Sequence, residues 1–346
     1  MGFNSFFEET VEEFNYDEKR KELIDNLDTL KHMSVEEVTL YNKYAYKFDV
    51  LQKKIWTPTD INNYDLTVSE IEALDPIIEI VDSTNQTAVE NWTLLRRLIH
   101  TMEYVANPGR NIKVIAKDKN TGKVLGMMSL GSDVTSIAAR DNFIGWTRQQ
   151  RNDGRLKHTC IGSSIVPTQP LGHDYVGGKL LALLCLSDEV QNEWKRRYGQ
   201  ILVGVTTTSL YGSYSQYNSL KYWNKRGKSS GSIVFEPTRA TLYKVRDWAN
   251  KRDPERYWEW YFALDDRGNK YKRDHKFRML NWVYSQLKIK DTKTFHQRGI
   301  YFSHLYENTA EFLREDIPEE KLKKRFDTST EHLVGLWKDR YASKRI

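Results

Sequence analysis

Apolar residues follow a helical spacing along the first hundred residues of the chain. Over residues 6–30 they recur every three or four positions among acids and lysines. Ser34-Val-Glu-Glu37 is a capping-box pattern, in which a hydroxyl and a carboxylate three residues apart satisfy free backbone amides, and it predicts a helix through residue 48. Further helices are expected at 66–70 and 90–104. Residues 1–107 are therefore predicted to form a helical N-terminal extension.

The pattern changes to strands and loops from Pro108 onward. Residues 111–117 alternate and are β-branched, and Asp118-Lys-Asn-Thr-Gly122 is a turn with glycine where a positive φ is needed, so a β-hairpin is expected. The later predicted elements are a buried strand at 158–167, a glycine loop at 172–178, a helix at 179–198 stopped by Gly199, a strand at 200–206, a short helix at 215–226 and a strand at 231–235. This order predicts an α/β core over 108–240, with one mixed sheet flanked by helices. Residues 241–346 read as a helix-rich, aromatic and basic region with one further strand near 299–304.

Composition excludes several classes of protein. A hydrophobic content of 39% and an aromatic content of 12% exclude a disordered chain. No apolar run is long enough to cross a bilayer, and the acidic start lacks the order of a signal peptide, so we expect a cytoplasmic protein without membrane contact. Cys160 and Cys185 have apolar neighbours and are predicted to be buried and free. No Cys/His spacing predicts a metal site.

The net charge of +6 is distributed unevenly. The opening is acidic, and we expect its helices to dock a protein partner. Basic segments interleaved with Trp and Tyr lie at 140–158, 194–197, 221–228 and 244–278. Such segments suit a polyanion that also offers bases for stacking, which makes DNA the expected partner, although solvated charged faces have the same appearance.

The unit of strand, proline, glycine loop and helix over 165–184 is the first candidate for chemistry. A helix start exposes unpaired N–H groups, and glycines let a phosphate approach the backbone. N-acyltransferases of the GNAT superfamily hold the pyrophosphate of acyl-CoA in this way, and the loop resembles theirs in part. The resemblance implies acetyl-CoA or a related acyl donor, and the alternative is a plain structural turn. The candidate cofactor-binding residues are Val166, Gln169, Gly172, Gly177, Gly178 and Lys179.

The segment Gln216-Tyr-Asn-Ser-Leu-Lys-Tyr-Trp223 resembles the acyltransferase element that places a tyrosine near the thioester. A phenol suits protonation of a leaving thiolate because its pKa is close to that of a thiol. Tyr217 and Tyr222 are the candidate acids, and at this spacing either one can instead be a core aromatic.

Residues 131–227 resemble a known family. The resemblance rests on Asp133, Arg140-Asp-Asn-Phe-Ile-Gly-Trp146, Arg148-Gln-Gln-Arg151, Leu156, Ser164-Ile-Val-Pro167, Tyr198-Gly199 and Tyr217-x5-Trp223. These follow the pattern of the DruA proteins of the Druantia anti-phage system. They are also similar to phage proteins classed with Mom, which adds a carbamoylmethyl group to adenine N6 in DNA. The resemblance implies an acyltransferase-like core that modifies or binds duplex DNA.

The Mom-like resemblance implies a serine, an aspartate and a tyrosine as site residues. Ser164, or its neighbour Ser163, matches the serine and Tyr217 the tyrosine. The aspartate position falls near Thr208, so another polar group would have to replace it. The candidates are Asp133, Asp141, Asp174 and His173, with Asp133 preferred.

The basic segment around Trp146 is the candidate DNA surface. Arginines there would grip phosphates while the indole wedges against or stacks on a base, as expected of enzymes that flip a base out of the duplex. The predicted DNA-binding residues are Arg140, Trp146, Arg148, Arg151 and Arg155. The competing interpretation is a surface ion pair of Arg140 and Asp141 beside a buried Trp146.

Three functions fit these observations. The first is a DNA modification enzyme that acts on adenine N6. The second is a catalytically inactive, DNA-binding component of an anti-phage defence or mobile-element system. The third is a structural or virion-associated phage protein.

Overall fold

The computed structural model describes residues 50–100, 109–168, 175–209, 215–229, 232–234, 239–262, 272–290, 293–295 and 297–342, together with Lys344 and six helical positions between 17 and 28. The helix predicted at 34–48 and most of the one predicted at 6–30 lie outside these residues. Docking of a protein partner by the acidic N-terminus therefore stays a prediction.

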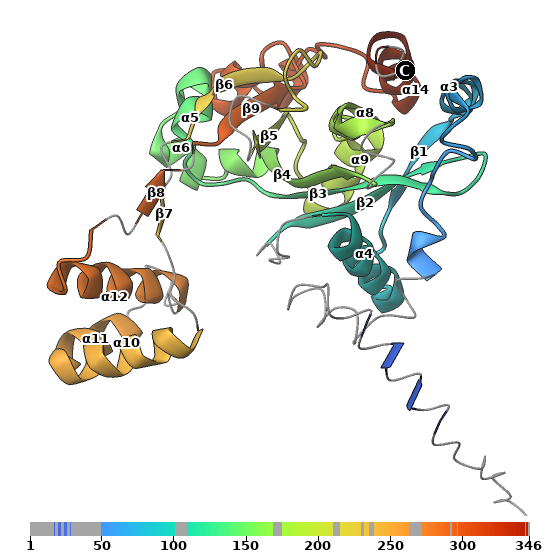
Figure 1. Cartoon of the computed structure of the whole chain (residues 1–346). Helices are drawn as coiled ribbons and strands as arrows, with labels where there is room; N and C mark the ends of the chain where they lie inside the picture. The colour runs from blue at the N-terminus through green and yellow to red at the C-terminus, as the bar shows by residue number, and fades with distance from the viewer. Residues whose placement is uncertain are drawn as a thin grey trace, which may run out of the picture.

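A seven-stranded mixed sheet forms the centre of the molecule (Figure 1). Its strands, in spatial order, are β1 (Pro76–Ile80), β2 (Asn111–Asp118), β3 (Val124–Ser132), β4 (Thr159–Pro167), β5 (Gly204–Ser209), β9 (Gly299–His304) and β6 (Asn224–Lys228). Neighbouring strands are antiparallel except β4 and β5, which are parallel. A parallel pair needs a crossover connection, and α8 (Gly177–Leu184) and α9 (Asp188–Tyr198) supply it. The prediction of an α/β fold with a mixed, helix-flanked sheet is confirmed.

Helices cover both faces of the sheet. On one face α8, α9 and α14 (Thr330–Trp337) bury the largest hydrophobic cluster against the inward residues of the strands, while α4 (Gln86–Ile99) packs on the other face (Figure 1). Alternate residues of β2 are buried, as expected for a strand with distinct faces. Gly126 of β3 allows α8 to approach closely, because a Cβ there would lie 2.7 Å from the Val166 carbonyl oxygen and would collide with Leu181.

The core contains seven further helical elements among the described residues. They are α3 (Tyr64–Ala73), α5 (Ala138–Ile144), α6 (Arg148–Asn152), η1 (Arg155–His158), α13 (Thr309–Leu313), η2 (Glu319–Lys321) and the π-helical η3 (Lys338–Ala342). Among the described residues, no helix has the length and apolar character of a membrane span. Cys160 and Cys185 are buried and free, as predicted, and burial raises the pKa of both thiols.

Several predicted elements are confirmed, and others need correction. The hairpin is β2 and β3, and Gly122 has φ +69°. The single helix expected at 179–198 is two helices, because Ser187 caps α9 by accepting from the Val190 N–H at 3.4 Å. The helix expected at 215–226 is wrong: Ser219 and Tyr222 have positive φ, and the segment ends in strand β6.

The sheet also draws on both flanking regions of the chain. Strand β1 and helix α4 belong to its layers, although sequence predicts only a helical extension there. Strand β9, from the C-terminal part, lies between β5 and β6. The boundaries expected near residues 107 and 240 therefore do not coincide with the limits of the sheet.

A three-helix unit lies apart from the sheet in Figure 1. It comprises α10 (Arg239–Arg252), α11 (Pro254–Phe262) and α12 (Lys272–Gln286). In the sequence these helices are preceded by β7 (Ser232–Val234) and followed by β8 (Lys293–Phe295), which pair with each other as a separate two-stranded sheet. The unit has a small core of its own, made of Ala249, Met279, Leu280 and Val283 with partly buried aromatic neighbours. We refer to residues 239–290 as the helical insert.

Candidate functional site

Strands β4 and β5 separate where sequence places the candidate serines. Their parallel pairing ends at Gly162 and Thr207. In the pairing of β3 with β4, Ser129 is opposite Ser164 and Leu130 is opposite Gly162, so Ser163 is the extra residue of a β-bulge. Ser164 is buried, and its hydroxyl accepts from the Arg96 Nε of α4 at 3.3 Å. Both serines therefore lie where the two strands diverge.

Tyr217 also lies near this point, but on the opposite face of the sheet from Ser164. It belongs to the cluster beneath α8, and its hydroxyl is 3.3 Å from that of Thr207, which donates to the Gly162 carbonyl at 3.0 Å. The ring packs between Trp223 and Tyr301, with centroids 5.2 Å away on each side. Burial raises the pKa of the Tyr217 phenol, which makes it a weaker proton donor.

The start of α8 is covered by protein side chains. Gln216 donates from Nε2 to the Ile165 carbonyl at 3.1 Å, and its amide fills the space that a Cβ on Gly178 would occupy. Lys179 donates to the Asn218 carbonyl at 2.7 Å. The predicted site for a pyrophosphate is thus in contact with the chain's own segment 215–223.

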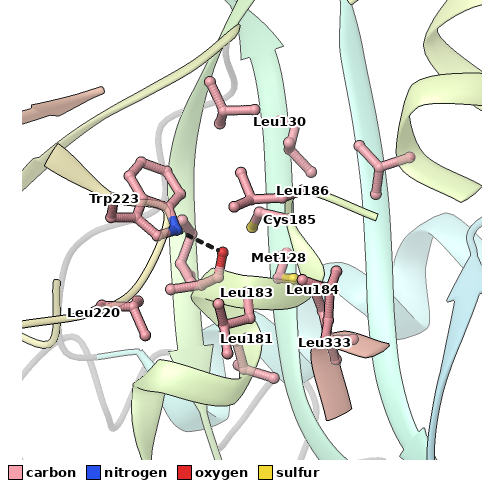
Figure 2. Close-up of a cluster of buried hydrophobic side chains, with 14 of the residues drawn as sticks. Met128, Leu130, Leu181, Leu183, Leu184, Cys185, Leu186, Leu220, Trp223 and Leu333 are labelled. Atoms are coloured by element: carbon pink, nitrogen blue, oxygen red, sulfur yellow. Dashed lines mark hydrogen bonds between the residues drawn. The ribbon is translucent and has the colours of Figure 1, made fainter. Parts of the chain in front are cut away.

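Figure 2 shows how this segment is held against α8. Leu220 and Trp223 point into the leucine-rich cluster of the helix, and the indole Nε1 of Trp223 donates to the Ala182 carbonyl at 2.9 Å. Val166 is half-buried on the other face, beside the α4 cluster. Gln169 and Gly172, like His173 and Asp174, lie outside the described residues. Binding of an acyl donor by these residues stays a prediction.

Tyr222 is held by the C-terminal segment of the chain. Its ring stacks on Phe326 with centroids 3.6 Å apart, and its hydroxyl is 2.9 Å from Nε2 of His332 on α14. These contacts give the residue a packing role beside α14. The structure does not bring it into contact with Ser164.

Arg140 is the centre of a buried ion network. Its guanidinium lies 2.7 Å from Asp133 Oδ1 and 2.7 Å from Asp141 Oδ1, and the side chains of Arg140 and Asp133 are fully buried. Trp146 donates from Nε1 to Asp141 at 3.0 Å, and the Thr206 hydroxyl donates to Asp133 at 2.8 Å. Burial raises the pKa of Asp133, although the charge of Arg140 opposes that rise.

This network changes the interpretation of two predicted DNA-binding residues. The competing interpretation, a surface ion pair, is wrong for Arg140 because its side chain is fully buried. The guanidinium is also not available to a phosphate, since it is paired with two aspartates inside the protein. Trp146 is buried beside it. Both side chains instead fix the loop and helix that follow β3.

The three other predicted DNA-binding residues are nearer the surface. Arg151 lies 3.5 Å from Asp141, at the edge of the network, and Arg155 pairs with Glu315 at 2.7 Å. Arg148 is exposed on α6, and among the described residues it has no ion pair. Among the five predicted DNA-binding residues, Arg148 is therefore the one whose side chain is both exposed and without an ion pair in the described part of the chain.

The sequence of the chain is similar to that of a known protein family. The model of a family described as Druantia protein DruA matches residues 34–315. The chain belongs to the DruA family. Druantia protein DruA of Escherichia coli (strain UMEA 4076-1) is 27% identical over 262 residues, which are 70% of this chain and 62% of that protein. The chain thus covers less than two thirds of this relative's length. No solved structure matches the chain.

Family membership confirms the DruA part of the predicted resemblance. The likeness to Mom and to the GNAT superfamily stays a prediction. The range matched by the DruA family includes both the diverging strands and the helical insert.

Proposed function

We propose that this protein is a component of an anti-phage defence system that binds DNA, and that the helical insert supplies the binding surface. Membership of the DruA family supports the defence role, since the E. coli relative carries the name of the Druantia system. The distribution of charge supports the second part and is the observation on which the proposal depends.

The three helices of the insert account for the net positive charge of the chain. They contain ten Lys and Arg and four Asp and Glu, which leaves 43 of each kind in the rest of the sequence. A surplus of six positive charges on these three helices concentrates positive potential there. Such a concentration attracts the phosphates of DNA and steers association.

Part of this charge lies on the exposed side of α10. Lys244, Lys251 and Arg252 are exposed and, at 100° per residue, fall within about a quarter of the helix circumference. Lys251 pairs with Asp247 at 2.7 Å, whereas Lys244 and Arg252 have no carboxylate partner among the described residues. These two cations are available to phosphates.

The insert also presents aromatic rings on α11. Trp258, Tyr261 and Phe262 are 43%, 48% and 57% exposed. Their rings contact one another with centroids 5.3–5.5 Å apart. Trp248, Trp260 and Trp282 instead face the inside of the insert and hold its helices together. Exposed aromatic rings beside cations offer stacking surfaces for bases.

The test is DNA binding by the full chain, measured by fluorescence anisotropy with labelled duplex and single-stranded oligonucleotides. The double variant Lys244→Glu/Arg252→Glu should bind at least tenfold more weakly than the wild type. The control Lys53→Glu/Lys54→Glu changes the net charge equally at two exposed positions outside the insert, and it should bind within about twofold of the wild type. An equal loss of DNA affinity in both variants would show that only the net charge matters, and it would reject the insert as the DNA-binding surface.

A second candidate function is transfer of an acyl-type group from acetyl-CoA or a related donor to adenine N6. One observation favours it: the parallel strands β4 and β5 diverge beyond Gly162, in the second half of the strand that leads to helix α8, as the acyltransferase resemblance leads one to expect. The packing of Gln216 and Lys179 against that site weighs against it, because a donor would have to displace them.

Nucleoside mass spectrometry decides on this second candidate. DNA incubated with the wild-type protein and an acyl donor would yield a deoxyadenosine of increased mass, and this product would be absent when Ser164→Ala replaces the wild type. Unmodified nucleosides with every donor would eliminate transfer.

A further inference from the structure

Three basic side chains from distant parts of the sequence meet at the β6 edge of the sheet. They are Arg226 of β6, His304 of β9 and Arg325 of the segment that follows η2. Arg325 Nη1 lies 3.3 Å from His304 Nδ1, and it donates to the carbonyls of His304 at 3.2 Å and Tyr222 at 3.4 Å. The Arg226 guanidinium lies over the ring of Phe143, 3.3 Å from its centroid.

No carboxylate in the described part of the chain neutralises this cluster. Among the described residues, none of the three forms an ion pair, and the guanidinium of Arg226 has no hydrogen-bond acceptor even though its Nε is buried. Burial and the charge of Arg325 lower the pKa of Arg226. Burial and the two guanidiniums lower the pKa of His304 to about 4.

Acids on the neighbouring elements are already bound elsewhere. Asp141 of α5 is paired with Arg140, Asp188 of α9 with Lys324, and Asp327 accepts from the Ser329 N–H at 2.9 Å. On β6, the flanking charged residues Lys225 and Lys228 are cations as well. Among the residues that the structure describes, no carboxylate therefore forms an ion pair with the cluster.

Another arginine of the same fold has carboxylate partners. Arg140, which is fully buried, is neutralised by Asp133 and Asp141, whereas the partly buried Arg226 and Arg325 pair with no carboxylate among the described residues. A partly buried cation without a counter-ion is costly, and a buried donor without an acceptor adds to that cost. Two neighbouring arginines without a carboxylate partner are expected when a bound anionic ligand supplies the counter-ion.

We infer that Arg226, His304 and Arg325 form a binding site for a phosphate group. Guanidiniums present planar, forked donors that match phosphate oxygens, and two of them beside an imidazole suit one tetrahedral anion. The π-face of Phe143 holds the Arg226 fork flat and limits its rotamers. The phosphate can belong to a nucleotide or to a nucleic-acid backbone, which offer the same group. The site lies outside the helical insert, and the inference does not rest on DNA binding there.

The experiment measures binding of inorganic phosphate, dAMP and a duplex oligonucleotide to the full chain by calorimetry at low ionic strength. Arg226→Gln should weaken at least one of these probes tenfold or more. Arg340→Gln, at an exposed arginine on η3, should leave all three unchanged. The probe that binds most tightly identifies the source of the phosphate. Equal binding of every probe by both variants and the wild type would overturn the inference, as would no binding of any probe by the wild type.

Histidine NMR supplies a readout that misfolding cannot imitate. The His304 imidazole should titrate near pH 4 in the free protein and at a pH at least one unit higher with phosphate bound, since an anion favours the imidazolium. The variant Lys244→Glu/Arg252→Glu should keep this shift. Failure of the DNA-binding proposal and failure of the phosphate site are therefore distinguishable, and an unmoved His304 titration at saturating phosphate would reject the site.

Discussion

The buried network around Arg140 predicts a large loss of stability when that side chain is removed. In Arg140→Met, the carboxylates of Asp133 and Asp141 lose the cation that lies 2.7 Å from each of them. Removing one partner of a buried ion pair costs about 3–5 kcal/mol, because the remaining charge stays buried and uncompensated. Two carboxylates are left here, so we expect about 4–5 kcal/mol, a large share of the roughly 5–15 kcal/mol by which domains are stable.

Urea unfolding followed by tryptophan fluorescence measures this loss. The control Arg148→Met removes an exposed arginine eight residues away and should change the unfolding free energy by less than about 0.5 kcal/mol. The two variants also separate structure from binding. If Arg140 served DNA rather than the fold, the unfolding free energy of Arg140→Met would lie within about 1 kcal/mol of the wild-type value and the variant would lose DNA affinity. That result would refute a structural role for Arg140.

The loss of unfolding free energy in Arg140→Met, called the deficit below, should also depend on pH in a defined direction. Burial raises the pKa of Asp133 in the folded protein above its unfolded value, and loss of Arg140 raises it further. A raised folded pKa means that the folded state binds the proton more tightly, so protonation favours folding. The deficit of Arg140→Met should therefore shrink as the pH falls through the folded pKa of Asp133. A constant deficit down to pH 4 would contradict this.

Four further predictions follow from single contacts. Gly178→Ala should destabilise the protein by about 1–3 kcal/mol because its Cβ collides with Gln216, and Gln216→Ala in the same chain should recover part of that loss in urea unfolding. Ser164→Ala removes the acceptor of Arg96 Nε and should cost about 1–2 kcal/mol, whereas Ser163→Ala, at the exposed bulge, should cost less than about 0.5 kcal/mol. Because the folded pKa of His304 is about 4, below its unfolded value, its contribution to stability is full above pH 6.5 and is lost as the pH falls toward 4, and His304→Gln should flatten the wild-type decline of melting temperature across that window. Trp258→Ala and Phe262→Ala should lower affinity for single-stranded DNA with an unchanged melting temperature, since both rings are exposed; unchanged affinity would remove α11 from the binding surface.

Local signals predicted the parts of the fold that local chemistry determines. The β2–β3 hairpin needs alternation and a glycine with positive φ at 122, and both are visible in the sequence. Gly199 ends α9 in the left-handed conformation for the same reason. Strand β6 could not be found in this way, since Asn-Lys-Arg-Gly-Lys has no strand pattern and its partner β9 begins some seventy residues later.

The candidate site shows the same limit. Ser164 and Tyr217 lie near the divergence of β4 and β5, yet their side chains are on opposite faces, which depends on the bulge at Ser163. Sequence placed Arg140 on a surface, because burial depends on Asp133 and on how the segment folds back onto β3. The cluster of Arg226, His304 and Arg325 combines three separate segments, so no spacing of residues in the sequence predicts it. The basic segment at 221–228 was the one visible sign.

The charge distribution gives the account its most direct test. The slope of log Kobs for duplex DNA against log salt counts the phosphates that the protein neutralises, at about −0.9 per phosphate. If the helical insert is the binding surface, the slope for Lys244→Glu/Arg252→Glu should be shallower than that of the wild type by about 2, while Lys53→Glu/Lys54→Glu keeps the wild-type slope. Identical slopes for all three proteins would contradict DNA binding by the insert.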